Sequence, residues 1–340
     1  MPVLSSFGTR YPFHPFPTGW FAVGFADDLA PGDVRPLKYF DSDLVLFRTQ
    51  GGTAVVIDAH CPHLGAHLGY DSKVVGETII CPFHAWRFDT GGRCVGVPFA
   101  KVVPPRARVR TWPVAERGGM IFIWHDLDGA PPQWELPVWD ERRKRPGAGF
   151  RKMHDDFGAA HPQDVFENGV DFAHFPGVHS TGKAISDGAI ITDGPRFYSP
   201  VRILPMDYEG PVSPEIGSTV ESEVWGGGLS RVESRTPHAP GVMTIYYVSV
   251  TPVYAGLSHY YVHQLFLIDD DCTMSDEAID RFTSLAAEHG EKEQWSDGNI
   301  WPHKKYVAEP MLSSADGPIL KYREWYKQFH PRVEQPIAAE

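Results

Sequence analysis

The sequence predicts an α+β protein in which a small antiparallel β domain precedes a larger domain of antiparallel sheet and helices. Three observations carry this prediction. Short apolar runs between turn residues fill the first third, a stretch rich in Pro, Gly and charge follows residue 125, and longer alternating segments lie among helical patterns beyond it. A chain of 340 residues is long enough for two cores. We place residues 1–127 in the first domain and 128–340 in the second.

Compact apolar runs bounded by Gly, Asp and Pro predict the strands of the first domain. These runs occupy residues 44–47, 54–57, 78–80 and 120–124. The chain then becomes rich in Pro and charge, with Pro131-Pro132 and a basic run at residues 141–146. This change of composition predicts a crossing between the domains.

Alternating segments predict an antiparallel sheet in the second domain. They occupy residues 218–225, 242–250 and 259–268. Tyrosines on the last two segments alternate, so half of them are expected to face inward, with core packing as the default role. Ser275 followed by two acidic residues predicts the start of a helix. A break is expected at Gly290, and a second helical stretch then carries Asp297.

Two short motifs, Cys-Pro-His and Cys-Pro-Phe-His, place two thiols and two imidazoles near one another. In a Rieske [2Fe–2S] centre one iron takes two Cys ligands and the other takes two His. Mixed pairs let each loop reach both irons, so the motifs predict such a cluster. The alternative is a Cys2His2 zinc site, which normally shows separate Cys pairs and His pairs. The predicted cluster ligands are Cys61, His63, Cys81 and His84.

A second pair of histidines, His174 and His179, lies further along the chain. Non-haem Fe(II) sites use two His and one carboxylate on one face and leave the other face open. A pair with this spacing is usually unrelated when it stands alone, but the cluster motifs and Asp171, three residues before His174, favour a metal site. The third ligand comes from a distant acidic residue, and the candidates are Asp280, Asp297 and Asp316.

These motifs resemble those of the catalytic subunits of Rieske non-haem iron oxygenases. Residues 61–65 and 81–86 resemble the two cluster loops of the family, with Ala85 where the family usually has Gly. Both residues are small, so we expect little effect. The run 167–179 resembles the mononuclear-iron motif. Three further segments resemble the branch of 3-ketosteroid 9α-hydroxylases and cholesterol 7-desaturases, at residues 92–100, 103–105 and 120–126.

The resemblance implies a helix-grip catalytic domain with Asp297 as the iron-binding carboxylate. It also implies a head-to-tail homotrimer in which the cluster of one subunit serves the iron of the next. In this arrangement Asp171 bridges an iron-ligating His and a cluster-ligating His of the neighbour. The likeness fades over residues 181–290, where the substrate pocket is expected, so branch membership is better supported than any particular substrate.

The two metal sites together imply a terminal oxygenase. A Rieske cluster passes single electrons and has no open coordination position, whereas the Fe(II) site binds O2. The chain has no dinucleotide fingerprint, so we expect an NAD(P)H-dependent reductase with flavin and a plant-type [2Fe–2S] cluster. The expected reaction is hydroxylation, desaturation or oxidative dealkylation of an apolar, steroid-like molecule. The alternatives are an aromatic-ring dihydroxylating dioxygenase and a Rieske electron carrier with a silent second domain.

Composition limits the partners and the compartment. The net charge of −12 argues against a nucleic-acid partner. No apolar run is long enough to span a bilayer, and residues 1–19 lack the pattern of a signal peptide. Two of the four Cys are assigned to the cluster, so a disulfide framework is not expected. We therefore expect a cytoplasmic protein, and the resemblance implies an enzyme of steroid or aromatic catabolism.

Overall fold

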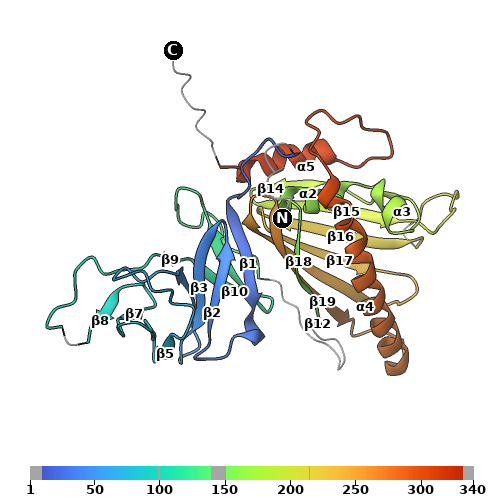
Figure 1. Ribbon diagram of the computed structural model, residues 1–340. Coiled ribbons are helices and arrows are strands. Elements are labelled where there is room, and N and C mark those ends of the chain that lie inside the picture. The colour runs from blue at the N-terminus through green and yellow to red at the C-terminus, as the bar shows by residue number, and fades with distance from the viewer. Residues whose placement is uncertain (1–9, 99, 139–150, 214, 332–340) are drawn as a thin grey trace, which may run out of the picture. The chain divides into compact units, whose positions relative to one another are not determined.

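The computed structural model describes residues 10–98, 100–138, 151–213 and 215–331 (Figure 1). The chain divides into two compact units. Gly19–Val138 form the first unit, and the described residues on either side of it form the second. The division at residue 127 stays a prediction. Of the crossing predicted over residues 125–150, residues 139–150 lie outside the described residues.

The first unit consists of three small antiparallel sheets, with strand orders β1-β11-β10, β2-β3-β4-β9 and β5-β6-β7-β8. All four apolar runs predicted to be strands are confirmed, as β3, β4, β6 and β11. The elements of this unit are β1 (Gly19–Phe25), η2 (Ala26–Asp28), β2 (Val34–Tyr39), β3 (Ser42–Arg48), β4 (Ala54–Asp58), β5 (Lys73–Val75), β6 (Thr78–Ile80), β7 (Arg87–Asp89), β8 (Cys94–Gly96), β9 (Thr111–Trp112), β10 (Val114–Arg117) and β11 (Met120–His125).

The core of the first unit reaches the two Cys-containing loops. Phe47, Ile57 and Phe88 are fully buried and belong to the same cluster of packed side chains as Cys61 and Cys81. Burying such aromatic and aliphatic side chains contributes about 1.5–3 kcal/mol each. The loops are therefore held at their inner ends by the hydrophobic core.

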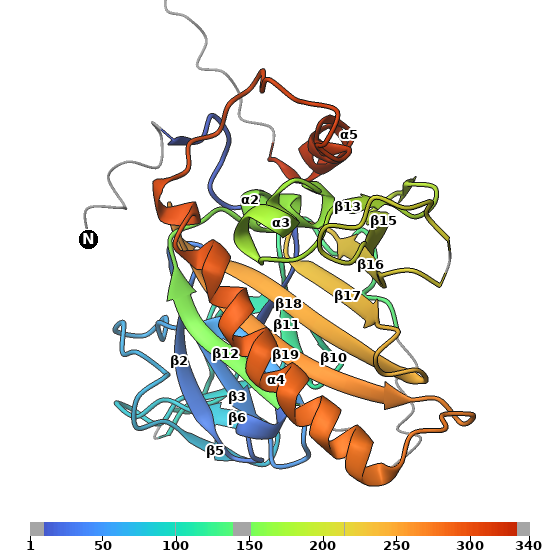
Figure 2. The same ribbon diagram turned by 90° about the vertical axis from the view of Figure 1, so that its right-hand side faces the viewer.

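The second unit is built on one large antiparallel sheet, ordered β12-β19-β18-β17-β16-β15-β13, with β14 paired to β15. Helix α4 runs across one face of this sheet (Figure 2). The elements are β12 (Arg151–Gly158), α2 (Pro162–Glu167), η3 (Asn168–Val170), α3 (His174–Val178), β13 (Ala184–Ser186), β14 (Ile191–Asp193), β15 (Arg196–Ile203), β16 (Ser218–Trp225), β17 (Leu229–Arg235), β18 (Val242–Tyr254), β19 (Leu257–Ile268), α4 (Asp276–Gly298), η4 (Trp301–His303), α5 (Ile319–Tyr326) and η5 (Lys327–Phe329).

The start of α4 is confirmed and the expected break within it is wrong. The Ser275 hydroxyl accepts a hydrogen bond from the Ala278 N–H over 3.2 Å, as an N-cap does. The helix then continues through Gly290 to Gly298. A glycine inside a helix costs only about 1 kcal/mol relative to alanine, and Gly290 is buried against the cavity described below.

Within the described residues, no helix is long and apolar enough to cross a membrane.

Helix α2 is fastened by buried charges. Its Glu167, 4% exposed, receives two hydrogen bonds from the Arg323 guanidinium of α5, at 2.6 and 2.8 Å. Its Asp164, 2% exposed, accepts a hydrogen bond of 2.6 Å from the Tyr11 hydroxyl and pairs with Lys304. Breaking a buried pair by removing one partner costs about 3–5 kcal/mol. These contacts fix the position of the segment that follows α2.

Acid is expected to weaken the fold through His263, a side chain of β19 that is 2% exposed. Burial lowers the pKa of this imidazole to about 4, whereas the unfolded chain titrates near 6.5. Between these values only the unfolded chain binds the proton, so the free energy of unfolding decreases as the pH falls. The expected decrease is on the order of 2–3 kcal/mol.

Denaturant unfolding at pH 6.5 and 4.5, with the metal content held constant, measures this effect. The variant His263→Gln should lose part of the pH dependence. The remainder comes in part from His330, whose pKa burial also lowers to about 4. The control variant is His289→Gln, which replaces an exposed histidine by the same residue. Equal pH dependence in the wild type and His263→Gln would contradict the assignment.

Candidate metal centres and substrate cavity

Two loops of the first unit share one backbone arrangement. The Cys61 N–H donates to the Ala66 carbonyl over 2.9 Å, and the Cys81 N–H donates to the Trp86 carbonyl over 2.8 Å. The first loop follows β4, and the second connects β6 and β7. A tight loop of this kind sets a Cys at its start and a His two or three residues later. The sequence motifs therefore correspond to one structural device used twice.

Each loop turns through a residue in the left-handed region. Gly65 has a φ of 75° and Ala85 has a φ of 55°. An alanine in this conformation is strained because its Cβ approaches the following carbonyl oxygen. The sequence analysis expected little effect from Ala85 in place of the family's usual Gly. That expectation considered only the size of the side chain. The structure adds a backbone strain that glycine does not have.

We therefore expect Ala85→Gly to raise the free energy of unfolding by about 1 kcal/mol. The thermal midpoint, measured with the metal content held constant, should rise accordingly. The matched control is Ala66→Gly, because Ala66 has no positive φ and its replacement should destabilise the chain. A lower midpoint for Ala85→Gly would show that the strain is compensated elsewhere.

The four predicted cluster ligands divide into an inner and an outer pair. Cys61 and Cys81 are 3% and 2% exposed, and burial raises the pKa of the Cys61 thiol to about 11. His63 and His84 are exposed, and their ring centroids lie 4.7 Å apart. Two buried thiols and two exposed imidazoles match the two unlike ends of a Rieske cluster.

The spacing of these four donors does not suit a single zinc ion. Zinc gathers its ligand atoms at about 2.0–2.3 Å from one point. Across the part of the chain that is described, the only set of three His, Cys, Asp or Glu ligand atoms within 4.8 Å of one another lies in the second unit.

The ring of Trp86, a residue to which the sequence analysis assigned no role, stacks on the His63 ring. The two ring centroids are 4.5 Å apart and the planes are inclined by 10°.

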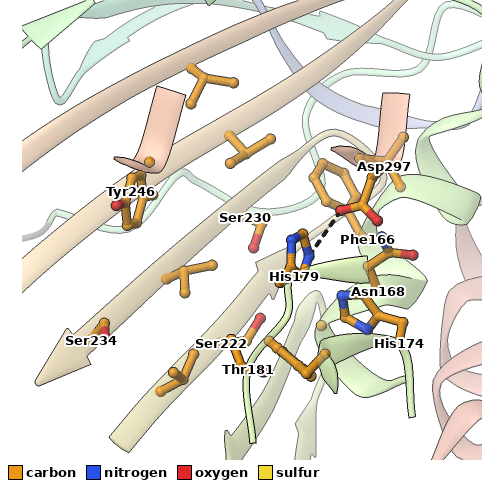
Figure 3. Close-up of a pocket in the computed structure, with 18 of the residues that line it drawn as sticks. Phe166, Asn168, His174, His179, Thr181, Ser222, Ser230, Ser234, Tyr246 and Asp297 are labelled. Carbon is orange, nitrogen blue, oxygen red and sulfur yellow. Dashed lines mark ion pairs between the residues drawn. The ribbon is translucent and has the colours of Figure 1, made fainter. Parts of the chain in front are cut away.

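The set of three converging ligand atoms in the second unit belongs to His174, His179 and Asp297. His174 begins α3, His179 caps its C-terminal end, and Asp297 lies in the last turn of α4. His179 Nε2 is 3.3 Å from Asp297 Oδ2, and the two His rings are 5.0 Å apart (Figure 3). The structure therefore brings together the two histidines and one of the three candidate carboxylates. This donor set fits a non-haem Fe(II) site.

The two other carboxylates lie away from the histidines. Asp280 is exposed near the start of α4. Its distance from Asp297 along the helix is about 25 Å. Asp316 is half-buried in the segment before α5, where it accepts a hydrogen bond from the Ser313 N–H. Asp297 itself is 9% exposed.

Asp171 orients His174 through its backbone. The Asp171 carbonyl accepts the hydrogen bond from His174 Nδ1, which leaves Nε2 for the site. Burial lowers the pKa of the His174 imidazole, so it is neutral and able to bind metal at neutral pH. Within the described residues the Asp171 carboxylate makes no hydrogen bond or ion pair. The resemblance implies a hydrogen bond from an iron-ligating His to Asp171, and the contact found here joins His174 to the Asp171 carbonyl.

A cavity of about 330 Å³ adjoins the three residues. Its floor is formed by strands β16 to β19, and most of its lining is apolar. Of the tyrosines on the alternating segments, Tyr246 and Tyr260 line the cavity and Tyr247 and Tyr261 do not. Gly169 passes so close to the floor that a Cβ there would lie 2.8 Å from Ser222 Oγ. The aliphatic lining residues on the floor are Val220, Val232, Val248 and Val262.

Comparison with known proteins agrees with both units. The Rieske [2Fe-2S] domain matches residues 19–113, and the 3-ketosteroid 9α-hydroxylase C-terminal domain matches residues 123–330. The oxygenase component of 3-ketosteroid-9-alpha-monooxygenase from Rhodococcus rhodochrous is 30% identical, over 94% of this chain and 85% of that protein. This chain belongs to the 3-ketosteroid 9α-hydroxylase family of Rieske oxygenases. The resemblance seen in the sequence is confirmed.

Other relatives and solved structures extend the comparison. The cholesterol 7-desaturase of Xenopus laevis is 30% identical over 93% of this chain and 72% of that protein. Among solved structures, Pseudomonas putida NdmA with caffeine has a TM-score of 0.69 at 20% identity, over 91% of this chain and 89% of that one. Dicamba monooxygenase bound to dicamba has a TM-score of 0.69 at 19% identity, over 93% of this chain and 98% of that one. At such identities the structures support the fold alone, and they confirm the predicted α+β class.

Family membership settles the chemistry at a general level. This Rieske oxygenase is an oxidoreductase that incorporates O2 and carries a [2Fe–2S] cluster and a mononuclear iron. As an oxygenase component, it receives electrons from a separate reductase.

Proposed function

We propose that this chain is the terminal oxygenase of a two-component monooxygenase that acts on an apolar, steroid-like molecule. The observation that carries the proposal is the position of His174, His179 and Asp297 at the wall of a largely apolar cavity. Relatives named for acting on 3-ketosteroids and cholesterol support the substrate class. The reaction is hydroxylation, or desaturation or dealkylation where the bound substrate presents its C–H bond differently.

Each metal group has an assigned set of residues in this proposal. Two of the four cluster ligands are buried thiols that anchor the cluster in the core of the first unit, and two are exposed imidazoles that face partners. The cluster supplies single electrons and the iron site supplies O2 activation when both are bound. The cluster residues are Cys61, His63, Cys81 and His84, and the iron residues are His174, His179 and Asp297.

The chain's own residues perform three tasks around the iron site. The Asp171 carbonyl holds His174 Nδ1–H and so aims Nε2 at the site. The valines of the floor exclude water from an apolar substrate. The buried pair of Glu167 and Arg323 holds α2, from whose end the ligand segment departs.

The proposal includes the partners and the assembly. Electrons come from an NAD(P)H-dependent reductase with flavin and a plant-type cluster. Three subunits form a head-to-tail ring, and the Asp171 carboxylate meets the cluster of the neighbouring subunit. The enzyme works in the cytoplasm, where its cysteines stay reduced.

Metal analysis together with turnover tests the proposal. The loaded chain should contain about three irons and two acid-labile sulfides, with the EPR of a mixed Cys/His cluster. Apolar polycyclic compounds should then be screened for O2 consumption coupled to NADH oxidation in the presence of a reductase. One zinc without sulfide would contradict the cluster. Cluster reduction without any O2-dependent product across such a screen would favour an electron carrier.

A further inference from the structure

The end of the cavity remote from the iron-site residues is polar. Figure 3 shows Tyr246 and Ser234 at that end, on β18 and β17, whereas Ser230 lies beside His179. Ser230 and Ser234 are four residues apart on the same face of β17, which separates the two ends by about 13 Å. A molecule that spans the cavity between them is extended.

Gln264 holds the Tyr246 hydroxyl. The two residues are direct partners in the ladder between β18 and β19, and Gln264 Nε2 donates a hydrogen bond to Tyr246 Oη over 2.9 Å. Gln264 is fully buried, and its Oε1 has no hydrogen-bond partner in the part of the chain that is described. A buried amide with an unmade hydrogen bond costs about 1–3 kcal/mol. Core packing alone does not account for an amide at this position, whereas support of Tyr246 does.

Tyr246 is left with a proton to donate. Its oxygen already accepts from Gln264, so its O–H is available to a ligand in the cavity. Burial raises the pKa of Tyr246 to about 12, which keeps the phenol protonated at neutral pH. Ser234 faces the same end, and its hydroxyl makes no hydrogen bond to another described residue. Two hydroxyl donors therefore lie at the remote end of the cavity.

The charge of the cavity selects a neutral ligand. Neither Lys nor Arg is among the described residues that line it. An ionised carboxylate at the remote end would have no Lys or Arg partner among the described lining residues, which makes its burial unfavourable. A carbonyl oxygen is neutral and accepts two hydrogen bonds. It accepts from a hydroxyl donor without a buried charge and, unlike a hydroxyl group, brings no O–H that needs a partner of its own.

We propose that Tyr246, oriented by Gln264, binds a neutral carbonyl oxygen of the substrate at the end remote from the C–H bond that is oxidised. The inference rests on the proposed function and adds a residue that determines specificity. Fixing the remote end of a rigid molecule decides which of its carbons reaches the iron-site residues. Tyr246 thus selects both the substrate and the position of oxidation.

Equilibrium binding to the oxidised holoenzyme without reductase tests this inference. The probes are 5α-androstan-3-one and its hydrocarbon 5α-androstane, both supplied from a cyclodextrin carrier. The wild type should bind the ketone about tenfold more tightly than the hydrocarbon, the value of one net hydrogen bond. In Tyr246→Phe, ketone affinity should fall about tenfold and hydrocarbon affinity should stay the same.

The matched control is Tyr247→Phe. It removes a hydroxyl from the neighbouring residue of β18, whose side chain is fully buried and does not line the cavity. Both affinities should be unchanged. Gln264→Leu should lower ketone affinity about threefold, because Tyr246 is then present but not held.

Three results would overturn the inference. They are a wild type without ketone preference, a Tyr246→Phe variant that keeps the preference, and a variant that loses both affinities equally. The test is separable from the proposed function because it needs no turnover. Oxidation of substrates without any acceptor, at undiminished efficiency, would contradict the carbonyl site alone. A ketone preference that depends on Tyr246 in a chain without O2-dependent activity would contradict the proposed function alone.

Discussion

Replacing Asp297 by alanine is expected to remove about one iron of three per chain and to abolish O2-dependent turnover. Asp297 Oδ2 lies 3.3 Å from His179 Nε2, in the one described set of three converging ligand atoms. Without the carboxylate, two neutral imidazoles remain, and they hold Fe(II) weakly. The cluster lies in the other unit, so its absorption and EPR should be unchanged. Iron analysis measures the first effect, and O2-dependent turnover of one substrate measures the second.

Controls for this result come from the other two candidate carboxylates. Asp280→Ala alters an exposed carboxylate of the same helix, and Asp316→Ala alters a half-buried carboxylate before α5. Both variants should keep their iron and activity. His174→Ala and His179→Ala should behave like Asp297→Ala. Full iron and activity in Asp297→Ala would place the carboxylate ligand elsewhere.

The second large effect is expected for Asp171→Asn. The carbonyl of residue 171 holds His174, and asparagine keeps that carbonyl. Both metals and substrate binding should therefore persist. The carboxylate, which makes no hydrogen bond or ion pair to a described residue, is proposed to meet a cluster-ligating His of the neighbouring subunit. Single-turnover electron transfer from reduced cluster to iron should collapse in the variant while the trimer remains.

Three further measurements make this test specific to the carboxylate. Asp193→Asn changes an exposed acid of β14 and should transfer electrons at the wild-type rate. Sedimentation shows whether the trimer is retained. Iron analysis shows whether the site is still loaded. An unchanged transfer rate in Asp171→Asn, or a native enzyme that is active as a monomer, would refute the bridging role.

The cluster motifs could be recognised from the sequence because their information is local. Each loop supplies a thiol and an imidazole within four residues, and short strands present the loops. The structure adds which donors are buried and which are exposed. It also shows the positive φ of Ala85, where the residue type matters for the backbone rather than for its volume.

The iron site was only partly accessible to sequence reasoning. His174 and His179 are five residues apart, and a short helix brings them together. The choice of Asp297 over Asp280 and Asp316 required a resemblance, because the residues alone left all three open. Helix α4 brings Asp297 and not Asp280 close to the histidines, since it runs unbroken through Gly290 and only its last turn lies beside them.

By itself, the sequence determined the two-part α+β organisation, the mixed thiol and imidazole loops, and the paired histidines. These features depend on residues close together in the chain and on the periodicity of strands and helices. Only the tertiary structure decided which tyrosines of the alternating strands face the cavity, which atom of Asp171 holds His174, and that Gln264 supports Tyr246. Those outcomes depend on the register of β18 against β19 and on burial, which neighbours distant in the chain impose.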